Sequence, residues 1–205
     1  MIFVTVNVSP SISSYHKYCT YFTFWHNSSE RKYFERRLFV QKLQYEIIRM
    51  FYEPKNGHPF KIDPYKALVF PRPIGWISSL SKKGIPNLAP YSYFNAVADE
   101  PPQVMFCSNG DSAYGGYKDS LANILSTKEF VVNFATANTR DAMNISSSNY
   151  EPNEDEFVAA KLKKRKSKLV KPPSVNDSPV NLECKLLKTL KLKTNTKKIS
   201  TMVIG

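Results

Sequence analysis

Residues 71–109 read PRPIGWISSLSKKGIPNLAPYSYFNAVADEPPQVMFCSN, and residues 117–123 read YKDSLAN. The longer stretch begins with two extended segments joined by a tight turn. Gly75–Ser81 is apolar and rich in residues that favour strands. Lys82-Lys83-Gly84 supplies the turn, with a glycine where a positive φ is needed, and Leu88–Ala98 then runs back. The pattern predicts an antiparallel pair of strands.

The second half of this motif combines a further strand with the start of a helix. A proline pair breaks the chain before Gln103–Cys107, which is predicted to be a short buried strand. Asp119 or Ser120 is predicted to cap a helix that continues through Leu121-Ala122-Asn123. Backbone N–H groups, small hydroxyls and the ammonium of Lys118 at a helix start suit a phosphate. The sequence therefore predicts a phosphate site here.

The order of these motifs resembles the flavin reductase-like family, whose members hold FMN on a split β-barrel. RPIGWIS, NLAPYSYFNAV, DEPPQVMF and KDSLANI stand in the family's order, and EFVVNFAT, AMNISS, DEF, LVKPPSV, SPVNLECKLL and TMVIG continue it. The similarity covers Phe51–Gly205 and is far more specific than a lone glycine pattern. It implies a β-rich fold with short helices. Members usually continue past TMVIG with further strands, so we expect the barrel to be incomplete at the C-terminus.

The length of 205 residues fits one ordinary domain plus an extension. We predict an FMN-binding domain at residues 50–205 and leave residues 1–49 unassigned. Glu30–Met50 could form a helix, and Met50 could be the natural start of the protein, which is the interpretation we favour. Met1–Val8 is a poor secretory signal and too short to span a membrane. We expect a cytoplasmic location, or a mitochondrial one if residues 1–49 are a transit segment.

Further elements are predicted downstream of the helix. We expect strands at Glu129–Ala135, Pro179–Leu192 and Thr201–Ile204, because apolar and other residues alternate or run together there. Asn138–Ser147 is predicted to be a short helix with Thr139 as a possible cap, and Glu156–Leu162 a helical turn. Upstream, the sequence predicts a short extended run at Ala67–Phe70.

The net charge of +12 is concentrated outside the motifs. Residues 50–160 carry nine basic and twelve acidic side chains, whereas residues 161–205 carry thirteen basic and two acidic ones. The densest basic run, Lys161–Lys171, is either a patch for a polyanion or a solvated surface loop. No aromatic residue interrupts it, which removes the stacking used in single-strand binding. We therefore predict a surface loop and no nucleic-acid partner.

The cysteines and histidines indicate neither disulfides nor a metal site. Cys19, Cys107 and Cys184 are odd in number and widely spaced, so no disulfide framework is implied. Cys107 and Cys184 lie in apolar runs and are predicted to be buried, reduced thiols. The spacing of His16, Cys19 and His26 matches no tetrahedral metal pattern.

A flavin carries its own redox chemistry, and the protein supplies binding and orientation. We therefore predict a phosphate anchor and a ring cradle, and no catalytic residue. Lys118, Ser120 and Ser92 are the predicted anchor, because the family's KD[ST] and APYS segments match them. Asn87, Ala89 and Ser108 follow for the ring. The full predicted set is Lys118, Ser120, Ser92, Asp119, Asn87, Ala89, Pro90, Tyr91, Ser108, Ser78 and Ser79.

Nearby aromatic residues are mostly predicted to be structural. Trp76, Tyr91, Tyr93 and Phe94 are expected to pack in the barrel wall. Arg72 could pair with a phosphate or with a carboxylate across an interface, and the sequence does not separate these. The loop NGDSAYGGY before Lys118 is less regular than the family's short connection.

The resemblance implies an FMN-binding oxidoreductase similar to NAD(P)H-dependent flavin reductases, with hydride passing from a nicotinamide to FMN and on to an acceptor. It also implies a homodimer with FMN near the interface. Two alternatives stay open: a truncated or degenerate relative without activity, and a binding module that uses the basic tail to hold nucleic acid or an acidic partner.

Overall fold

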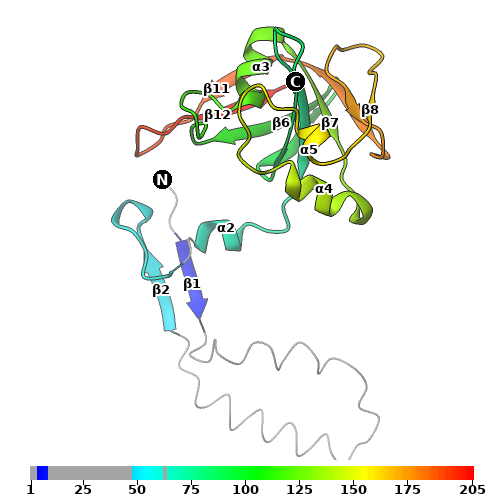
Figure 1. The fold of residues 1–205 in the computed structure, drawn as a ribbon. Coiled ribbons are helices and arrows are strands. Elements are labelled where there is room, and N and C mark those ends of the chain that lie inside the picture. The colour runs from blue at the N-terminus through cyan, green and yellow to red at the C-terminus, as the bar shows by residue number, and fades with distance from the viewer. Residues whose placement is uncertain (1–3, 9–47, 62–63) are drawn as a thin grey trace, which may run out of the picture. The chain divides into compact units, whose positions relative to one another are not determined.

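The computed structural model describes residues 4–8, 48–61 and 64–205, which divide into two compact units (Figure 1). The first unit ends at Leu68, and the second comprises Val69–Gly205. The first contains an antiparallel strand pair and two short helices: β1 (Val4–Val8), β2 (Ile48–Tyr52), η2 (Pro54–Asn56) and α2 (Pro64–Leu68).

Two predictions for this region are wrong where the structure tests them. The predicted helix Glu30–Met50 ends in residues of strand β2, and its part before residue 48 lies outside the described residues. Ala67 and Leu68, expected to be extended, belong to α2. This helix begins at Pro64, and proline is favoured at the first helical position because its missing N–H has no partner there in any case.

The second unit contains two four-stranded antiparallel sheets, shown with their helices in Figure 1. The first sheet has the order β10-β7-β3-β4, and the second has the order β11-β12-β6-β5. Their strands are β3 (Gly75–Leu80), β4 (Pro86–Tyr91), β5 (Phe94–Asp99), β6 (Pro102–Asn109), β7 (Glu129–Asn133), β10 (Asn181–Lys185), β11 (Lys188–Lys191) and β12 (Ser200–Ile204). Among the described residues the two sheets are not closed into one barrel.

The connecting segments carry four short helices and a small strand pair. These are α3 (Asp119–Thr127), η3 (Ala137–Thr139), α4 (Arg140–Ile145), α5 (Glu156–Ala159), β8 (Lys164–Arg165) and β9 (Ser174–Val175). The predicted helix Asn138–Ser147 is thus divided between η3 and α4. Thr139 makes a reciprocal capping box with Thr136 at η3 and no side-chain cap of α4.

The motif that opens the unit folds largely as its sequence predicts. Strand β3 occupies most of the expected range, and Gly84 in the following turn has φ of +80°. The prediction of one strand over Leu88–Ala98 is wrong, because the chain leaves the first sheet after Tyr91 and enters the second at Phe94. Between them, Tyr93 O accepts a hydrogen bond of 2.8 Å from Cys107 N in β6.

The late strand predicted at Pro179–Leu192 is divided for the same reason. Leu186 N donates to Lys128 O at 2.8 Å, beside the first sheet. The next residue, Leu187, donates from its N to Ile204 O at 2.9 Å, in the second sheet. Adjacent residues therefore bond to different sheets, so β10 ends and β11 begins.

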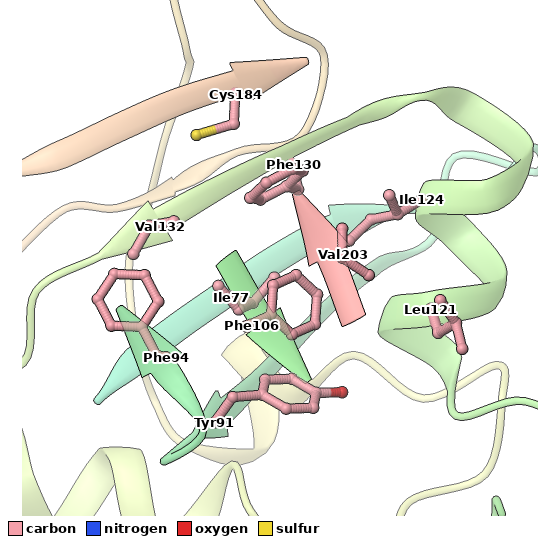
Figure 2. Packing of buried hydrophobic residues seen from close by; sticks show 10 residues of the cluster. All are labelled: Ile77, Tyr91, Phe94, Phe106, Leu121, Ile124, Phe130, Val132, Cys184 and Val203. Carbon is pink, nitrogen blue, oxygen red and sulfur yellow. The ribbon is translucent and has the colours of Figure 1, made fainter. Parts of the chain in front are cut away.

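The main hydrophobic core lies between the two sheets and α3 (Figure 2). Phe106 is at its centre, with its ring centroid 4.7 Å from that of Tyr91 and 5.8 Å from that of Phe130. Burial of such a ring stabilises the fold by about 2 kcal/mol. Gly75 approaches this core so closely that an added Cβ would lie 2.6 Å from Phe94 Cδ2.

A second cluster covers the opposite face of the first sheet. Because side chains alternate along a strand, Trp76 and its neighbour Ile77 point to opposite faces. Ile77 joins the main core, whereas Trp76 packs with Leu88, Phe157 and Val175. The prediction that Trp76 is structural is confirmed, and the cluster fixes α5 against β4.

One buried asparagine joins strands of the first sheet to the segment that follows. Asn133 Nδ2 donates to Trp76 O at 2.9 Å and to Ser78 Oγ at 3.2 Å. Its Oδ1 accepts from Val175 N at 2.8 Å and from Asn181 Nδ2 at 2.6 Å. The amide is fully buried and fully hydrogen-bonded, so it holds β3, β7, β9 and β10 in one arrangement.

The basic run Lys161–Lys171 is largely exposed, with only Ser167 and Val170 buried within it. Cys107 and Cys184 are buried, free thiols, as predicted, and burial raises the pKa of Cys107 and raises that of Cys184 to about 12. In the parts of the chain that the structure describes, no helix has the length and apolar character needed to cross a bilayer.

Candidate functional site

A hollow of about 280 Å³ opens where the two sheets and several loops meet. Its walls come from β4 and the residues after it, from β6 and the following loop, and from the start of α3. The loop after α4 and one residue of α5 complete them. The predicted site residues that line the hollow are Asn87, Ala89, Pro90, Tyr91, Ser92, Lys118, Asp119 and Ser120.

Asn87 is the centre of a buried polar chain on one wall. Its Oδ1 accepts hydrogen bonds from Ser120 Oγ at 2.6 Å and from Ser79 Oγ at 3.2 Å. Its Nδ2 donates to Glu156 Oε1 at 2.5 Å. Asn123 Nδ2 extends the chain by donating to Ser79 Oγ at 3.2 Å. These contacts connect β3, β4, α3 and α5.

Glu156 ends this chain at the first position of α5. The preceding residue, Asp155, caps the helix by accepting from Phe157 N at 3.0 Å, which places the Glu156 side chain against β4. Glu156 Oε2 accepts from Leu88 N at 3.0 Å. Burial raises the pKa of Glu156 to about 7, against the effect of its hydrogen bonds, and the nearby charge of Asp119 adds to the rise.

The start of α3 supplies the predicted lysine and hydroxyl. Lys118 is the N-cap residue and makes no side-chain cap, so the prediction that Asp119 or Ser120 caps the helix is wrong. The Ser120 hydroxyl is unavailable for capping because it is buried and donates to Asn87. Asp119 lies in the first turn, and burial raises its pKa. The first N–H groups of α3 have no partner within the helix.

Tyr91 links the hollow to the main core. Its ring packs in the core cluster, and its hydroxyl lies at the margin of that cluster (Figure 2). Burial raises the pKa of this hydroxyl, and the neighbouring hydroxyls of Ser120 and Ser108 oppose the rise. The predicted structural role of the ring is confirmed, while one edge of Tyr91 faces the hollow.

Three predicted residues do not line the hollow. Ser78 Oγ donates to Pro173 O at 2.6 Å and accepts from Asn133, so it belongs to the structural network of the first sheet. Ser79 acts one step behind the wall by donating to Asn87. Ser108 is buried in β6, and its Oγ has no hydrogen-bond partner among the described residues.

Arg72 has two contacts that bear on its predicted roles. Its Nη1 donates to Val69 O at 3.0 Å, and its guanidinium carbon lies 5.5 Å from the centroid of the Tyr93 ring. Tyr93 lines the hollow, so Arg72 contacts a residue of its wall without lining it itself.

Several residues that line the hollow were not predicted from the sequence. Glu156, Asp111 and the segment Ser146–Tyr150 line it, together with Cys107 and Asn109. Ser146 is fixed there because its Oγ accepts from Trp76 Nε1 at 2.9 Å and donates to Met143 O at 2.8 Å. Glu156 lies in the DEF motif and Ser146 in AMNISS, so both motifs marked the site without revealing which wall they form. Among the described residues no group of His, Cys, Asp and Glu could hold a metal ion.

Comparison with proteins of known sequence finds similar chains in bacteria. One relative, an uncharacterized protein of Aquifex aeolicus, is 47% identical over 123 residues, which are 60% of this chain and 62% of the relative. Another, an uncharacterized protein of Bacillus subtilis, is 34% identical over 127 residues, 60% of this chain and 61% of the relative. The match thus spans less than two thirds of the length of these relatives.

Some solved structures resemble this chain over a larger share of its length than these relatives do. Nitrilotriacetate monooxygenase component B from Bacillus cereus has a TM-score of 0.67 and 32% identity, covering 76% of this chain and 78% of its own. The 2-nitrobenzoate 2-nitroreductase of Pseudomonas fluorescens has a TM-score of 0.61 and 28% identity, covering 75% and 72%. A flavin reductase from Shewanella frigidimarina with a split-barrel domain shows the same fold at 20% identity, with a TM-score of 0.57 over 65% and 63%.

These likenesses agree with the two open sheets and with the order of motifs along the chain. The family model described as the flavin reductase like domain matches residues 67–205, which include the whole hollow and both sheets. The chain belongs to the flavin reductase-like domain family.

Proposed function

We propose that the hollow binds FMN and that the protein is an oxidoreductase that accepts hydride from NAD(P)H. One observation carries this proposal: Lys118, the start of α3 and the Asn87–Ser120 pair, far apart in sequence, line a single hollow. The family membership supports a flavin as the ligand, and the nitroreductase named above supports reductive chemistry.

The residues present fit the phosphate end of a flavin mononucleotide. Lys118 offers an ammonium at the start of α3, where the helix dipole favours an anion. Ser92 and the Ser146–Ser148 segment offer further hydroxyls from other walls. The carboxyl groups of Asp111 and Asp119 lie on the same hollow and oppose an anion, so we place the phosphate nearest Lys118.

The residues also fit a flavin ring. Ala89, Pro90 and Tyr91 present a mostly apolar wall, and the flat Tyr93 ring stands beside it. Tyr91, whose hydroxyl interacts with those of Ser120 and Ser108, lines the hollow and offers a polar group to the edge of the ring. When bound, the flavin would supply the hydride and electron-transfer chemistry. The protein's own part is to bind, to orient and to exclude water.

The phosphate anchor is tested by titrating FMN and riboflavin into the protein and following flavin fluorescence. Lys118→Ala should weaken FMN binding at least about tenfold, because a charged hydrogen bond to phosphate is lost, and leave riboflavin binding nearly unchanged. Lys83→Ala, in the exposed β3–β4 turn, is the matched control. Equal loss for both flavins, or no FMN binding by the unaltered protein, would overturn the proposal.

The electron donor is tested on the FMN-loaded protein without oxygen. Bleaching of flavin absorbance by NADH or NADPH supports the proposed reaction, and the faster of the two identifies the donor. Absence of bleaching by either would leave a flavin-binding protein with a different donor and would contradict this part of the proposal.

We also propose that residues 50–205 form the functional domain and that it works as a homodimer. Three apolar side chains of the second sheet are about half exposed or more: Val97 in β5, Leu187 beside β11 and Leu190 in β11. Exposed apolar side chains of this kind would be covered by a second protomer. Light scattering on the purified protein should give twice the monomer mass. A monomer at micromolar concentration would contradict the dimer.

A further inference from the structure

The polar chain in the hollow has a fixed direction of hydrogen bonding. Glu156, when ionised, can only accept hydrogen bonds, so the Asn87 amide must turn its NH₂ group toward it. The bond lengths agree, with 2.5 Å from Asn87 Nδ2 to Glu156 Oε1 and 3.0 Å from Leu88 N to Oε2. Asn87 Oδ1 then faces the Ser120 hydroxyl, which gives it its proton at 2.6 Å.

This direction decides what Ser120 can offer to a ligand. Its single hydroxyl proton is committed to Asn87, so only its lone pairs face other groups. A phosphate oxygen, which is itself an acceptor, gains nothing from them. Ser120 therefore contributes little to an anion while Glu156 is ionised.

Protonation of Glu156 reverses the chain. A proton taken from solvent forms an O–H bond at Oε1, and this O–H needs an acceptor where Asn87 now presents NH₂. A half-turn of the Asn87 amide places Oδ1 there and directs Nδ2 toward Ser120 and Ser79. The amide then donates to Ser120 Oγ. This releases the Ser120 proton from Asn87, so that it can be donated on the side of the hollow, where Ser120 also neighbours the Tyr91 hydroxyl.

We propose that Glu156 is a positioning residue that determines, through the Asn87 amide, whether Ser120 accepts or donates hydrogen bonds at the phosphate side of the hollow. This inference rests on the proposed function, since it takes a phosphate-bearing flavin as the ligand. It adds a proton-linked control of that site, in which anion binding and protonation of Glu156 favour each other.

The surroundings allow the switch near neutral pH. Burial raises the pKa of Glu156 to about 7, and the Asp119 charge from α3 contributes to the rise. Tyr91 on β4 is the other titratable group in electrostatic contact, and burial raises its own pKa further from neutrality. Lys118 and Asp111, which carry opposite charges, line the same hollow. Asp155, on the same helix, pairs with Lys164.

The test compares flavin binding at pH 6.0 and pH 8.0 in the unaltered protein and in Glu156→Gln. Glutamine keeps the shape of the side chain, and its NH₂ group is a permanent donor in place of the O–H of the protonated acid. In Glu156→Gln, the ratio of the FMN dissociation constants at the two pH values should reflect only the titration of FMN itself. In the unaltered protein, binding at pH 6.0 should be favoured over binding at pH 8.0 by about a further tenfold. Riboflavin, which lacks the phosphate, should show no such difference.

Ser120→Ala separates positioning from simple charge repulsion. If the hydroxyl carries the effect, this variant should lose the pH difference between itself and its Glu156→Gln double variant. If Ser120→Ala still binds FMN about tenfold more tightly at pH 6.0 than at pH 8.0 when measured against the double variant, Glu156 acts by charge alone and the proposal is overturned. Thermal unfolding of each variant at both pH values shows that the fold is intact.

A readout without flavin keeps the two proposals apart. Infrared difference spectra of the protein alone should show a protonated carboxyl band that disappears near pH 7 and is absent from Glu156→Gln. Protein that binds no flavin but shows this band contradicts the proposed function and leaves the switch standing. Protein that binds FMN equally at both pH values, relative to Glu156→Gln, overturns the switch and leaves the proposed function standing.

Discussion

At the scale of single residues, two buried polar side chains differ in what they contribute. Asn133 has its carbonyl and amide groups engaged by four partners and does not line the hollow, so its role is to hold the first sheet together. Glu156 lines the hollow, and burial raises its pKa to about 7. Each leads to a separate prediction.

Asn133→Ala should lower the free energy of unfolding by about 2–4 kcal/mol, because it removes four buried hydrogen bonds of the Asn133 side chain, including those with Val175 N and Trp76 O. Urea unfolding followed by tryptophan fluorescence measures this. Asn144→Ala, at an exposed position of α4, should change stability by less than about 0.5 kcal/mol. Equal effects of the two substitutions would contradict the structural role of Asn133.

Glu156 should make stability fall as pH rises. Its pKa is about 7 in the folded protein against an ordinary 4.5, so the folded state binds the proton more tightly. The contribution of Glu156 to the free energy of unfolding is therefore greatest at low pH and is lost between about pH 4.5 and pH 7. After allowance for partial solvent contact, this contribution is about 2 kcal/mol. Urea midpoints at pH 5 and pH 8 should differ more for the unaltered protein than for Glu156→Gln. An identical difference would show that Glu156 is not responsible.

The sequence predicted individual residues where the local pattern was sufficient. Gly84 was predicted from the demands of a turn, and its φ of +80° agrees. Lys118 and Ser120, predicted from the helix start and the family's KD[ST] segment, both line the hollow, and their role in binding stays a prediction. Glu156 was missed because its partner Asn87 lies 69 positions away, and no local periodicity indicates that α5 packs on β4. The direction of the Ser120 hydroxyl depends on that same distant contact.

At the scale of elements, the loop after β8 is held by carboxylates from two strands. Glu183 in β10 accepts from Lys168 N at 2.9 Å, Leu169 N at 2.6 Å and Val170 N at 3.3 Å. Glu129 in β7 accepts from Lys171 N at 2.9 Å. The basic run is therefore ordered through its backbone N–H groups, while most of its side chains remain exposed.

Glu183→Gln should loosen this loop. Slight burial raises the pKa of Glu183, but the N–H bonds from the loop outweigh it and the pKa lies below its ordinary value. The contribution of Glu183 to stability is thus present above the ordinary pKa of a glutamate and is lost as pH falls through the pKa of Glu183 in the folded protein. Hydrogen exchange of the amides of residues 168–170 should become faster at pH 7, with no change in Glu151→Gln, an exposed control. Unchanged exchange would show that the loop is held by other contacts.

Element boundaries were predicted less well than element types, for a physical reason. Leu88–Ala98 and Pro179–Leu192 each have a continuous strand pattern, yet each is divided where the chain passes from one sheet to the other. Both halves of such a segment are extended and partly buried, so composition does not mark the crossing. Hydrogen-bond partners from distant strands determine it.

At the scale of the whole molecule, the second unit contains every residue that lines the hollow. Residues 69–205 expressed alone should therefore unfold in one cooperative step and bind FMN with an affinity within about threefold of that of the full chain. Circular dichroism and fluorescence titration measure both quantities. Loss of binding with the fold retained would show that residues before 69 contribute to the site.

The passage from β4 to β5 has a further consequence. The hollow is lined by Asn87 from β4 in the first sheet and by Cys107 and Asn109 from β6 in the second sheet. A ligand bound in the hollow would contact both sheets and would resist their separation. Separating the two sheets in a single-molecule stretching experiment should then require more force with the ligand bound than without it.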